Sequence, residues 1–444
     1  MKAFYEALRQ LFKYKSAVIG LSFILILVVL AIYVVIAIPY SKAERLWRAG
    51  SEVWQENPRN ALPEWIDVFP GINLPKTIKI STSRIKGKVE SLGNGIEKVE
   101  LPLTFNYSYD GFPKEIAISF HAKYQTKQPF VVLHWFTPDG REIVFGNRGV
   151  SASEWYIISQ DADLKSKLGN LPPEKGLFAS PNDPTKPVKG KYKLIIEAYL
   201  FEKNSSIEAK LIVYGQVFGL AGTDHLRRDL MLGLLWGDPV ALGFGILGAL
   251  FTIVAMLIIS AVGVWYGGWV DAVIQRVTEI RMVIPTLPIL IGIAMFYSSS
   301  VWIILGAVIL LSIVGGQIKT FRAMFMQEKN APYVEAARCY GAKGIRIVFR
   351  YLIPRAIPWL IPSFVLLIPD LVFLEATLAM LGLGDPSLPT WGKILEDAFN
   401  TGALYHGYYY WVIEPSLFLM ITGYSFTMVG FTLDRILNPR LRER

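Results

Sequence analysis

The chain has 444 residues, of which 52% are hydrophobic and 13% aromatic, and its formal net charge is +9. A soluble domain of this length needs far fewer apolar residues, so the composition indicates membrane segments. The single cysteine, Cys339, excludes an intramolecular disulfide, and the lack of any G-x-x-x-x-G-K-[ST] sequence excludes a nucleotide site of the P-loop type.

Six apolar segments are predicted to be membrane-spanning helices, because about 20 mostly apolar residues cross a bilayer. The first, from Ser16 to Ile38, is too long for a signal-peptide core and has no small-residue cleavage site after it, so it is interpreted as a retained anchor. The other five are predicted near residues 240–266, 283–298, 300–318, 357–381 and 411–430. The predicted fold class is therefore an α-helical polytopic membrane protein with six transmembrane helices, the last five of which form a core at 217–434.

Basic residues near these helices indicate the orientation of the chain, since cytoplasmic loops carry an excess of Lys and Arg. They gather in the N-terminal tail (1–15), the loop before the third helix, the loop at 316–356 and the C-terminal tail (435–444). These residues are Lys2, Arg9, Lys13, Lys15, Arg276, Arg281, Lys319, Arg322, Lys329, Arg338, Lys343, Arg346, Arg350, Arg355, Arg435, Arg440, Arg442 and Arg444. Both termini are thus predicted to be cytoplasmic in a multi-pass cell-membrane protein. The positive charge is a topology signal, so nucleic acid is set aside as a partner, and membrane lipid is expected instead.

The segment 41–216, between the first two predicted helices, is then extracellular. From about residue 75 to 215, polar and apolar residues alternate in seven runs, a pattern typical of half-buried strands. Turn-forming pairs separate several runs: Asp110-Gly111, Asp139-Gly140 and Lys189-Gly190. We therefore expect a large extracellular β-sandwich-like insert between helices 1 and 2.

Other sites in the sequence are weakly indicated. Asn106 and Asn204 stand in glycosylation acceptor triplets, although such short patterns often occur by chance. The four histidines, His121, His134, His225 and His406, are scattered without metal-ligand spacing. No metal, no cofactor and no catalytic group is expected in this chain.

The loop between the fourth and fifth predicted helices contains "EAARCYGAKGIRIVFRYLIP", Glu335 to Pro354. A short helix is predicted to begin near Pro332, since proline suits a first turn, and to end at Gly341, which allows a sharp change of direction. A second amphipathic helix should follow, and the prolines from Pro354 onward should lead into the next span. From charge alone, this loop either projects a helix below the membrane or lies on anionic lipid.

The order of residues in this loop resembles the coupling-loop signature of bacterial and archaeal ABC importer permeases. That signature is E-A-A, three residues, G, nine residues and a segment that ends in proline. The matching residues here are Glu335, Ala336, Ala337, Gly341 and Pro354. Tyr351 and Ile353 depart from it, because the general signature has isoleucine and leucine there.

Three further elements resemble the C-type permease subunit of dipeptide and oligopeptide importers. "GTDHLRRD", Gly222 to Asp229, is similar to a G-T-D-x-x-G-R-D element before the second helix, with Arg227 in place of glycine. "LGLGDPSLPTWGKIL", Leu381 to Leu395, is similar to the loop after the fifth helix, and "LNPRLR", Leu437 to Arg442, to the C-terminal element. The matched residues of the external elements are Gly222, Thr223, Asp224, Arg228, Asp229, Trp391 and Gly392.

The resemblance covers residues 217–444 closely and 1–40 loosely, but not the β-rich insert. It implies a homologous B-type permease subunit, two cytoplasmic ABC ATPase subunits that hold ATP and Mg, and an extracellular substrate-binding protein. It also implies that the coupling loop 332–354 contacts an ATPase, where Glu335 would pair with a basic group. Arg338 and Arg346 would face either acidic groups there or lipid headgroups. Peptides are the default cargo, with oligosaccharides as the alternative.

Two carboxylates fall inside the fifth predicted helix. A carboxylate there costs about 2.5–3.5 kcal/mol on insertion scales unless it faces protein or water. Glu375 is predicted to face the translocation pathway or subunit interface, or else to make a structural hydrogen bond to a neighbouring helix. Asp370 is assigned to the same pathway or interface, or to backbone groups freed by Pro369.

Two other function classes compete with the importer permease. A membrane-anchored receptor explains the external β-rich domain but not the coupling loop. A secondary transporter needs internal repeats and broken helices, and the sequence contains no evident repeat.

Overall fold

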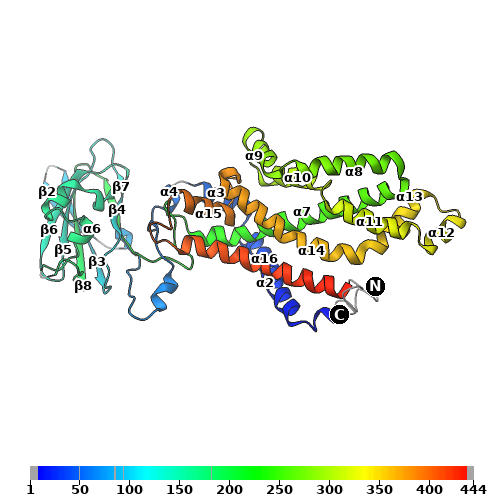
Figure 1. Cartoon of the computed structure of the whole chain (residues 1–444). Coiled ribbons are helices and arrows are strands. Elements are labelled where there is room, and N and C mark those ends of the chain that lie inside the picture. The colour runs from blue at the N-terminus through cyan, green and yellow to red at the C-terminus, as the bar shows by residue number, and fades with distance from the viewer. Residues whose placement is uncertain (1–8, 50, 85–86, 94, 182, 438–444) are drawn as a thin grey trace. The chain divides into compact units, whose positions relative to one another are not determined.

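The computed structural model describes residues 9–49, 51–84, 87–93, 95–181 and 183–437. The chain forms two compact units: a helical unit of residues 1–48 and 232–444, and a β unit of residues 49–231 (Figure 1). The predicted basic residues Lys2, Arg440, Arg442 and Arg444 lie outside the described residues, as does most of the C-terminal element at 437–442.

The helical unit consists of helices that precede and follow the β unit in the chain. Their bounds are α2 (Lys15–Ala37), α3 (Tyr40–Arg48), α7 (Leu230–Tyr266), α8 (Gly268–Val283), α9 (Thr286–Phe296), α10 (Val301–Ser312), α11 (Gln317–Lys329), α12 (Pro332–Cys339), α13 (Gly344–Ile347), α14 (Ile353–Leu378), α15 (Trp391–Asn400) and α16 (Tyr410–Leu437). Within the described residues, four helical runs are long and apolar enough to cross a membrane, or up to six if each of two bent pairs is one span. The protein is therefore a helical multi-pass membrane protein.

The two bent pairs are where the structure differs most from the predicted spans. The predicted span 283–298 corresponds to α9, which is the second helix of a bent pair and meets α8 at 79°. The predicted span 300–318 covers α10 and the start of α11, which meet at 47°. The loop predicted before the third helix is in fact α8. Pro285 explains the first break, because the residue before a proline disfavours helical backbone and Ile284 is extended.

Two arginines connect the broken helices. The Arg281 side chain donates to the carbonyl oxygens of Leu311 at 2.7 Å and Ile284 at 2.9 Å, and so caps two helix ends at once. The Arg322 guanidinium in α11 binds the Asp271 carboxylate in α8 through its Nε, at 2.8 Å from Oδ1. Side chains of the bent pairs themselves therefore join the two pairs to each other.

Close helix packing depends on small residues. A Cβ atom added at Gly20 of α2 would lie 2.8 Å from the Ser425 carbonyl of α16, and one at Gly430 of α16 would lie 2.6 Å from Leu366 of α14. Near the ends of the described chain, Leu11 packs with Ile436 in one apolar cluster. The first and last described segments thus lie together.

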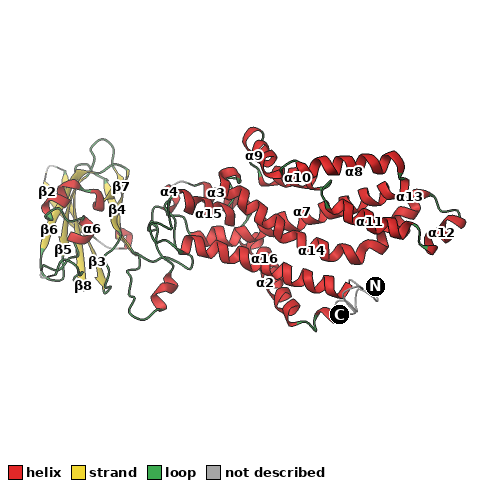
Figure 2. Ribbon diagram, viewed as in Figure 1, coloured by secondary structure: helices red, strands yellow, loops and turns green. Residues whose placement is uncertain are grey.

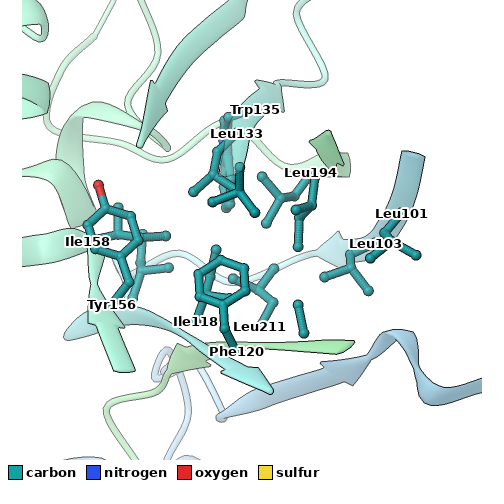
Figure 3. Close-up of a cluster of buried hydrophobic side chains, with 14 of the residues drawn as sticks. Leu101, Leu103, Ile118, Phe120, Leu133, Trp135, Tyr156, Ile158, Leu194 and Leu211 are labelled. Carbon is teal, nitrogen blue, oxygen red and sulfur yellow. The ribbon is translucent and has the colours of Figure 1, made fainter. Parts of the chain in front are cut away.

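The β unit is a two-sheet sandwich (Figure 2). Its strands are β1 (Ile78–Ser81), β2 (Lys88–Gly93), β3 (Ile96–Tyr107), β4 (Glu115–Lys123), β5 (Phe130–Phe136), β6 (Glu142–Gly149), β7 (Ser153–Ile157), β8 (Gly190–Leu200) and β9 (Ser206–Tyr214). The sheet orders are β1-β9-β4-β7 and β2-β3-β8-β5-β6, with antiparallel neighbours. Inward side chains of both sheets share one core, in which Phe120 and Leu211 face Leu133 and Leu194 (Figure 3). The predicted β-rich insert is confirmed.

All seven predicted runs form strands, and two more strands were not predicted. Both lie at the edges of the five-stranded sheet. Every described side chain of β2 is exposed, so that strand has no alternating pattern. The β6 sequence contains Gly146, whose φ of +69° belongs to a bulge in the pairing with β5. Edge strands that bury little carry little sequence signal.

The boundary of the insert also differs from the predicted one. Residues 217–231 belong to the β unit rather than to the permease core, and residues 41–48 belong to the helical unit. The reason is local pairing, since Val217 forms bridges with both Leu62 and Lys76. The insert thus ends only at Met231.

Candidate functional site

Helix α12, at one end of the helical unit, carries the coupling-loop residues (Figure 1). Pro332 occupies its first turn, where a missing N–H is tolerated. At its other end Gly341 has a φ of +77°, and the N–H of Ala342 donates to the carbonyl of Ala337 at 3.0 Å. This is a Schellman-type ending, so the predicted start and turn of the short helix are confirmed.

The two faces of α12 differ. Val334 is fully buried and Ala337 is 4% exposed, in a cluster that includes Phe325 of α11. Glu335 and Ala336 are on the exposed face. Ala337 therefore packs against the helical unit itself, while Glu335 and Ala336 remain available to a partner.

A group that we call the Trp265 cluster holds α12 in place: Trp265, Lys329, Arg338 and Gly344. Trp265 and Gly344 were not singled out from the sequence, whereas Arg338 was expected to face acidic groups of an ATPase or lipid headgroups. The Arg338 guanidinium lies 4.7 Å from the centre of the Trp265 ring, a cation–π contact. Lys329 Nζ donates to the carbonyls of Val264 at 2.6 Å and of Trp265 at 3.0 Å, which caps the end of α7. A Cβ on Gly344 would lie 2.4 Å from the indole nitrogen, so only glycine fits there. The sequence feature that could have pointed to this cluster is the position of Trp265 at the end of the predicted span 240–266.

The second predicted amphipathic helix is the start of a continuous helical run from Gly344 to Leu383. A π turn at Val348–Leu352 joins α13 to α14. Pro354 lies in the first turn of α14, and the wider π turn before it accommodates the missing N–H. The prolines at 358, 362 and 369 lie inside α14, not before it.

Pro354 also lines a small cavity of about 280 Å³ beside α12. Its other lining residues are Tyr333, Arg350, Tyr351 and Arg355. The Tyr333 hydroxyl donates to Glu328 at 2.6 Å; burial and this carboxylate raise the pKa of Tyr333 to about 12. The signature residues of the coupling loop thus share one end of the unit with a cluster of basic side chains.

At the opposite end of the helical unit, Trp391 and Gly392 fit α15 against two other helices. The Trp391 indole donates to the Leu234 carbonyl of α7 at 2.9 Å, and the residue is 1% exposed. A Cβ on Gly237 would lie 2.2 Å from the Trp391 ring, and one on Gly392 would lie 2.7 Å from Ala376 of α14. These two matched residues therefore have structural contacts, and no surface role is visible for them.

Glu375 is buried where α14 meets the start of α15. It is 6% exposed and is hydrogen-bonded to the side chain of Thr390. Thr390 Oγ1 also accepts the N–H of Lys393 at 3.2 Å, as the N-cap of α15. Glu375 thus makes a structural hydrogen bond to a neighbouring helix, which was the alternative prediction for it. A role of Glu375 in a pathway or interface stays a prediction.

Asp370 differs from Glu375, since it is exposed on α14. Among the described residues its carboxylate has no hydrogen-bond partner, so it does not satisfy backbone groups freed by Pro369.

A third carboxylate, Asp238 of α7, was not identified from the sequence. It is fully buried, and neither of its oxygens has a hydrogen-bond partner in the described part of the chain.

The element from Gly222 to Asp229 is a compact turn within the β unit. Gly222 has a φ of +71°. The Thr223 hydroxyl donates to the Pro58 carbonyl at 2.7 Å and accepts the Ala61 N–H at 2.9 Å. Asp224 Oδ1 accepts the N–H of Arg228 at 2.8 Å. Thr223, Asp224 and Arg228 are buried, so this element serves to fold the turn.

The carboxylates of this turn are shifted by their surroundings. Burial raises the pKa of Asp224 above its ordinary value even though the Arg228 guanidinium opposes the shift. Burial likewise raises the pKa of Asp229, whose Oδ1 accepts the Met231 N–H at 2.9 Å. For both groups the hydrogen bonds from local donors offset only part of the desolvation.

The remaining predicted sites lie on the surface of the β unit or lack ligand geometry. Asn106 is exposed in β3, and Asn204 is exposed between β8 and β9 with a φ of +68°. Their glycosylation stays a prediction. His134 Nδ1 lies 2.7 Å from a Glu142 oxygen, an ordinary cross-strand pair. No group of three metal-binding side chains occurs among the residues that the structure describes.

Comparisons with known families agree with the coupling-loop resemblance. The family described as "Binding-protein-dependent transport system inner membrane component" matches residues 253–443. The family described as "N-terminal TM domain of oligopeptide transport permease C" matches residues 3–56. Residues 57–252, which hold the β sandwich, lie between these two matches.

Individual proteins are similar over about half of the chain. The dipeptide transport system permease protein DppC of Bacillus subtilis is 29% identical over 225 residues, 50% of this chain and 69% of that protein. The oligopeptide permease protein OppC of the same organism is 30% identical over 226 residues, 50% of this chain and 72% of that protein. The glutathione permease protein GsiD of Pectobacterium atrosepticum is 29% identical over 226 residues, 50% of this chain and 73% of that protein. The chain therefore belongs to the binding-protein-dependent transport system inner membrane components, as a C-type permease subunit of the dipeptide and oligopeptide ABC transporter family.

Proposed function

We propose that this permease subunit serves an ATP-driven importer of dipeptides or oligopeptides. The observation that carries the proposal is the family match over 253–443, which includes α12 with its exposed Glu335 and its left-handed turn at Gly341. The names of the similar proteins, which refer to dipeptides, oligopeptides and glutathione, support a peptide as cargo.

The proposed assembly contains a homologous B-type permease subunit, two cytoplasmic ABC ATPase subunits that bind ATP and Mg, and an extracellular substrate-binding protein. Lipid surrounds the apolar helices. No step of ATP hydrolysis is assigned to this chain.

The proposed orientation places α12 and both termini in the cytoplasm and the β unit outside. The packing of Leu11 against Ile436 supports this, because it brings the two ends of the chain together. The charge distribution supports it as well, since the α12 end carries the basic side chains while Lys393 at the α15 end is paired with Glu396 and Asp397.

The Trp265 cluster explains how α12 would transmit movement. Val334 and Ala337 anchor α12 in the core, and Arg338 ties it to the end of α7. Gly341 then passes the chain directly to α13 and the long run into α14. When an ATPase subunit moves α12, both α7 and α14 should therefore follow, which is the kind of rigid coupling that alternating access requires.

The test uses the assembled transporter and measures ATP hydrolysis stimulated by a substrate-loaded binding protein. A Cβ on Gly341 would meet nothing within 4 Å, so Gly341→Ala adds only backbone strain of about 1–2 kcal/mol. We expect stimulation to fall in Gly341→Ala, to vanish in Gly341→Pro, and to be largely kept in Gly341→Asn, because asparagine tolerates left-handed backbone.

The control is Gly292→Ala in α9, another glycine with open space around it but without a positive φ. It should leave stimulation and membrane insertion unchanged. Normal stimulation in Gly341→Pro, with the chain inserted and the ATPase subunits bound, would contradict the assignment of α12 as the ATPase contact.

A further inference from the structure

The β unit contains a cavity of about 530 Å³ to which the proposed transport function assigns no role. It lies on the outer face of the four-stranded sheet, on the side away from the sandwich core. Its floor is a row of aligned residues that crosses all four strands. Ser81 of β1 pairs with Lys210 of β9, Lys210 with Ser119 of β4, and Ser119 with Trp155 of β7. The volume is in the range of small-molecule sites, which is about 300–1,000 Å³.

The wall of this cavity is the segment 53–57, and hydrogen bonds fix it in place. The Tyr214 hydroxyl donates to the Gln55 carbonyl, and Arg227 Nη1 donates to the Asn57 carbonyl at 2.7 Å. Glu56 of the same segment binds Lys79 at 3.2 Å and also binds Lys210. Because its floor and wall are both held by such contacts, the cavity is formed before any ligand binds.

Two lysines, two glutamates and His121 line the cavity. Lys79 and Lys210 stand against Glu56 and Glu208. Although partial burial opposes it, hydrogen bonds from Lys210 and Lys79 hold the pKa of Glu56 below its ordinary value, so Glu56 is ionised at neutral pH. Both lysines bind Glu56, and Glu208 is exposed to solvent. A neutral ligand rich in hydroxyl groups would therefore find both donors and acceptors in this lining.

Trp155 supplies the other half of the recognition chemistry. Its ring packs against the apolar cluster of Ala117, Ile212 and Tyr214 on the same outer face, and the side chain remains half-buried. A fixed indole at the edge of a polar cavity is a stacking platform for the C–H face of a sugar ring. Ser119 adds a hydroxyl that has no hydrogen-bond partner among the described residues, although the residue is 5% exposed.

From these features we infer that the outer face of the four-stranded sheet, between Trp155 and the segment 53–57, binds a neutral saccharide. Two sources share this chemistry, a soluble oligosaccharide and a glycan fixed in the cell envelope. The inference does not rest on the proposed peptide import, because binding to the β unit requires neither ATPase subunits nor transport.

The test is isothermal titration of the full chain in detergent with maltotriose, mannotriose and chitotriose, and with trialanine as a zwitterionic probe. We expect at least one trisaccharide to bind. Trp155→Ala should weaken its affinity at least about tenfold, which is about 1.4 kcal/mol, and Trp155→Phe should recover part of the loss. Trp65→Ala is the matched control, since Trp65 is an exposed tryptophan of the β unit that does not line the cavity.

Three results would overturn the inference. They are the absence of binding by all three trisaccharides at about 10 mM, an affinity unchanged by Trp155→Ala, and tighter binding of trialanine than of any sugar at this surface. Thermal unfolding of each variant separates lost binding from lost folding.

A transport experiment in cells that contain the whole transporter distinguishes the two sources. If the cells take up the bound trisaccharide and Trp155→Ala reduces this uptake, the source is soluble. Binding without uptake would identify a fixed glycan.

Discussion

Arg227 has a backbone conformation that few non-glycine residues adopt, with a φ of +68°. The C-type permease element that this turn resembles has glycine at this position, and glycine adopts such a backbone without the strain that arginine has. The structure shows what offsets that strain. The guanidinium lies 4.5 Å from the centre of the Tyr214 ring and forms a buried ion pair with Glu115. Both partners belong to the β sandwich, which explains why a chain with this insert can use arginine here.

We predict that Arg227→Gly destabilises the β unit despite relieving the strained backbone. Leaving a buried carboxylate unpaired costs about 3–5 kcal/mol, and removing left-handed strain returns about 1–2 kcal/mol, so the net loss should be roughly 1–4 kcal/mol. The side chains of Arg227 and Glu115 are only 5% and 15% exposed, so solvent screens this pair little. Thermal unfolding of the purified chain measures the effect.

The matched control is the double variant Arg227→Gly with Glu115→Gln. It removes the unpaired charge and should be more stable than Arg227→Gly alone. If the two variants unfold at the same temperature, the ion pair is not what supports this turn.

Two glycines of the coupling loop show that one residue type can be required for different reasons. Gly341 is surrounded by open space, but its φ of +77° disfavours other residues. Gly344 has no positive φ, but Trp265 occupies the position of its Cβ. The first requirement was visible in the sequence, because a helix ending is a local feature. The second was not, because Trp265 is distant in the chain and comes close only in the folded unit.

At the scale of elements, the connection between β8 and β9 is held by one carboxylate. Glu202 accepts the backbone N–H groups of Gln125 at 2.7 Å, Thr126 at 2.8 Å and Lys127 at 2.7 Å. The hydrogen bond from the Thr126 side chain and these backbone donors lower the pKa of Glu202 from 4.5 to about 2. This single group therefore joins the β8–β9 turn to the loop between β4 and β5.

We predict that this carboxylate makes the stability of the β unit depend on pH. Because the folded-state pKa is lowered, the stabilisation is fully present above pH 4.5 and is lost as the pH falls toward about 2. The difference in melting temperature between the wild type and Glu202→Gln should be largest above pH 4.5 and should narrow below it. Glu90→Gln, at an exposed glutamate of β2, should show no such narrowing. A constant difference across this range would contradict the prediction.

The bent helix pairs belong to the same scale. The apolar composition located both regions correctly. The prediction treated each region as one straight membrane-spanning helix, whereas each bent pair contains a break. Arg281 and the Arg322–Asp271 pair stabilise the bends through contacts between helices. Hydropathy along the chain does not contain such contacts, so it could not distinguish a straight span from a broken one.

At the scale of the whole molecule, the β unit should fold as an independent body, but only with its flanking segments. Residues 49–231 expressed alone should give a strand-rich circular dichroism spectrum and melt cooperatively. A fragment of residues 75–215 lacks Glu56, which is the ion-pair partner of Lys79 and Lys210, and it lacks Arg227, which is the partner of Glu115. We expect it to melt at least about 5 °C lower, since roughly 2–4 °C corresponds to each kcal/mol at this size. Equal melting temperatures would show that the flanking segments contribute nothing.

Features that repeat along the chain, or that depend on neighbours within a few residues, could be predicted from the amino-acid sequence. Hydropathy located the apolar helices, alternation located seven strands, and local motifs identified the transporter family and the ends of α12. Which of these residues come into contact was visible only in the folded chain. The tertiary structure buried Glu375 against Thr390 and left Asp370 exposed on the same helix, although both are carboxylates in one apolar stretch. It also moved the end of the insert to Met231 and aligned Ser81, Lys210, Ser119 and Trp155 in one row. The physical reason is that burial and pairing depend on neighbours far apart in sequence, whereas periodicity and turn chemistry depend on neighbours within a few residues.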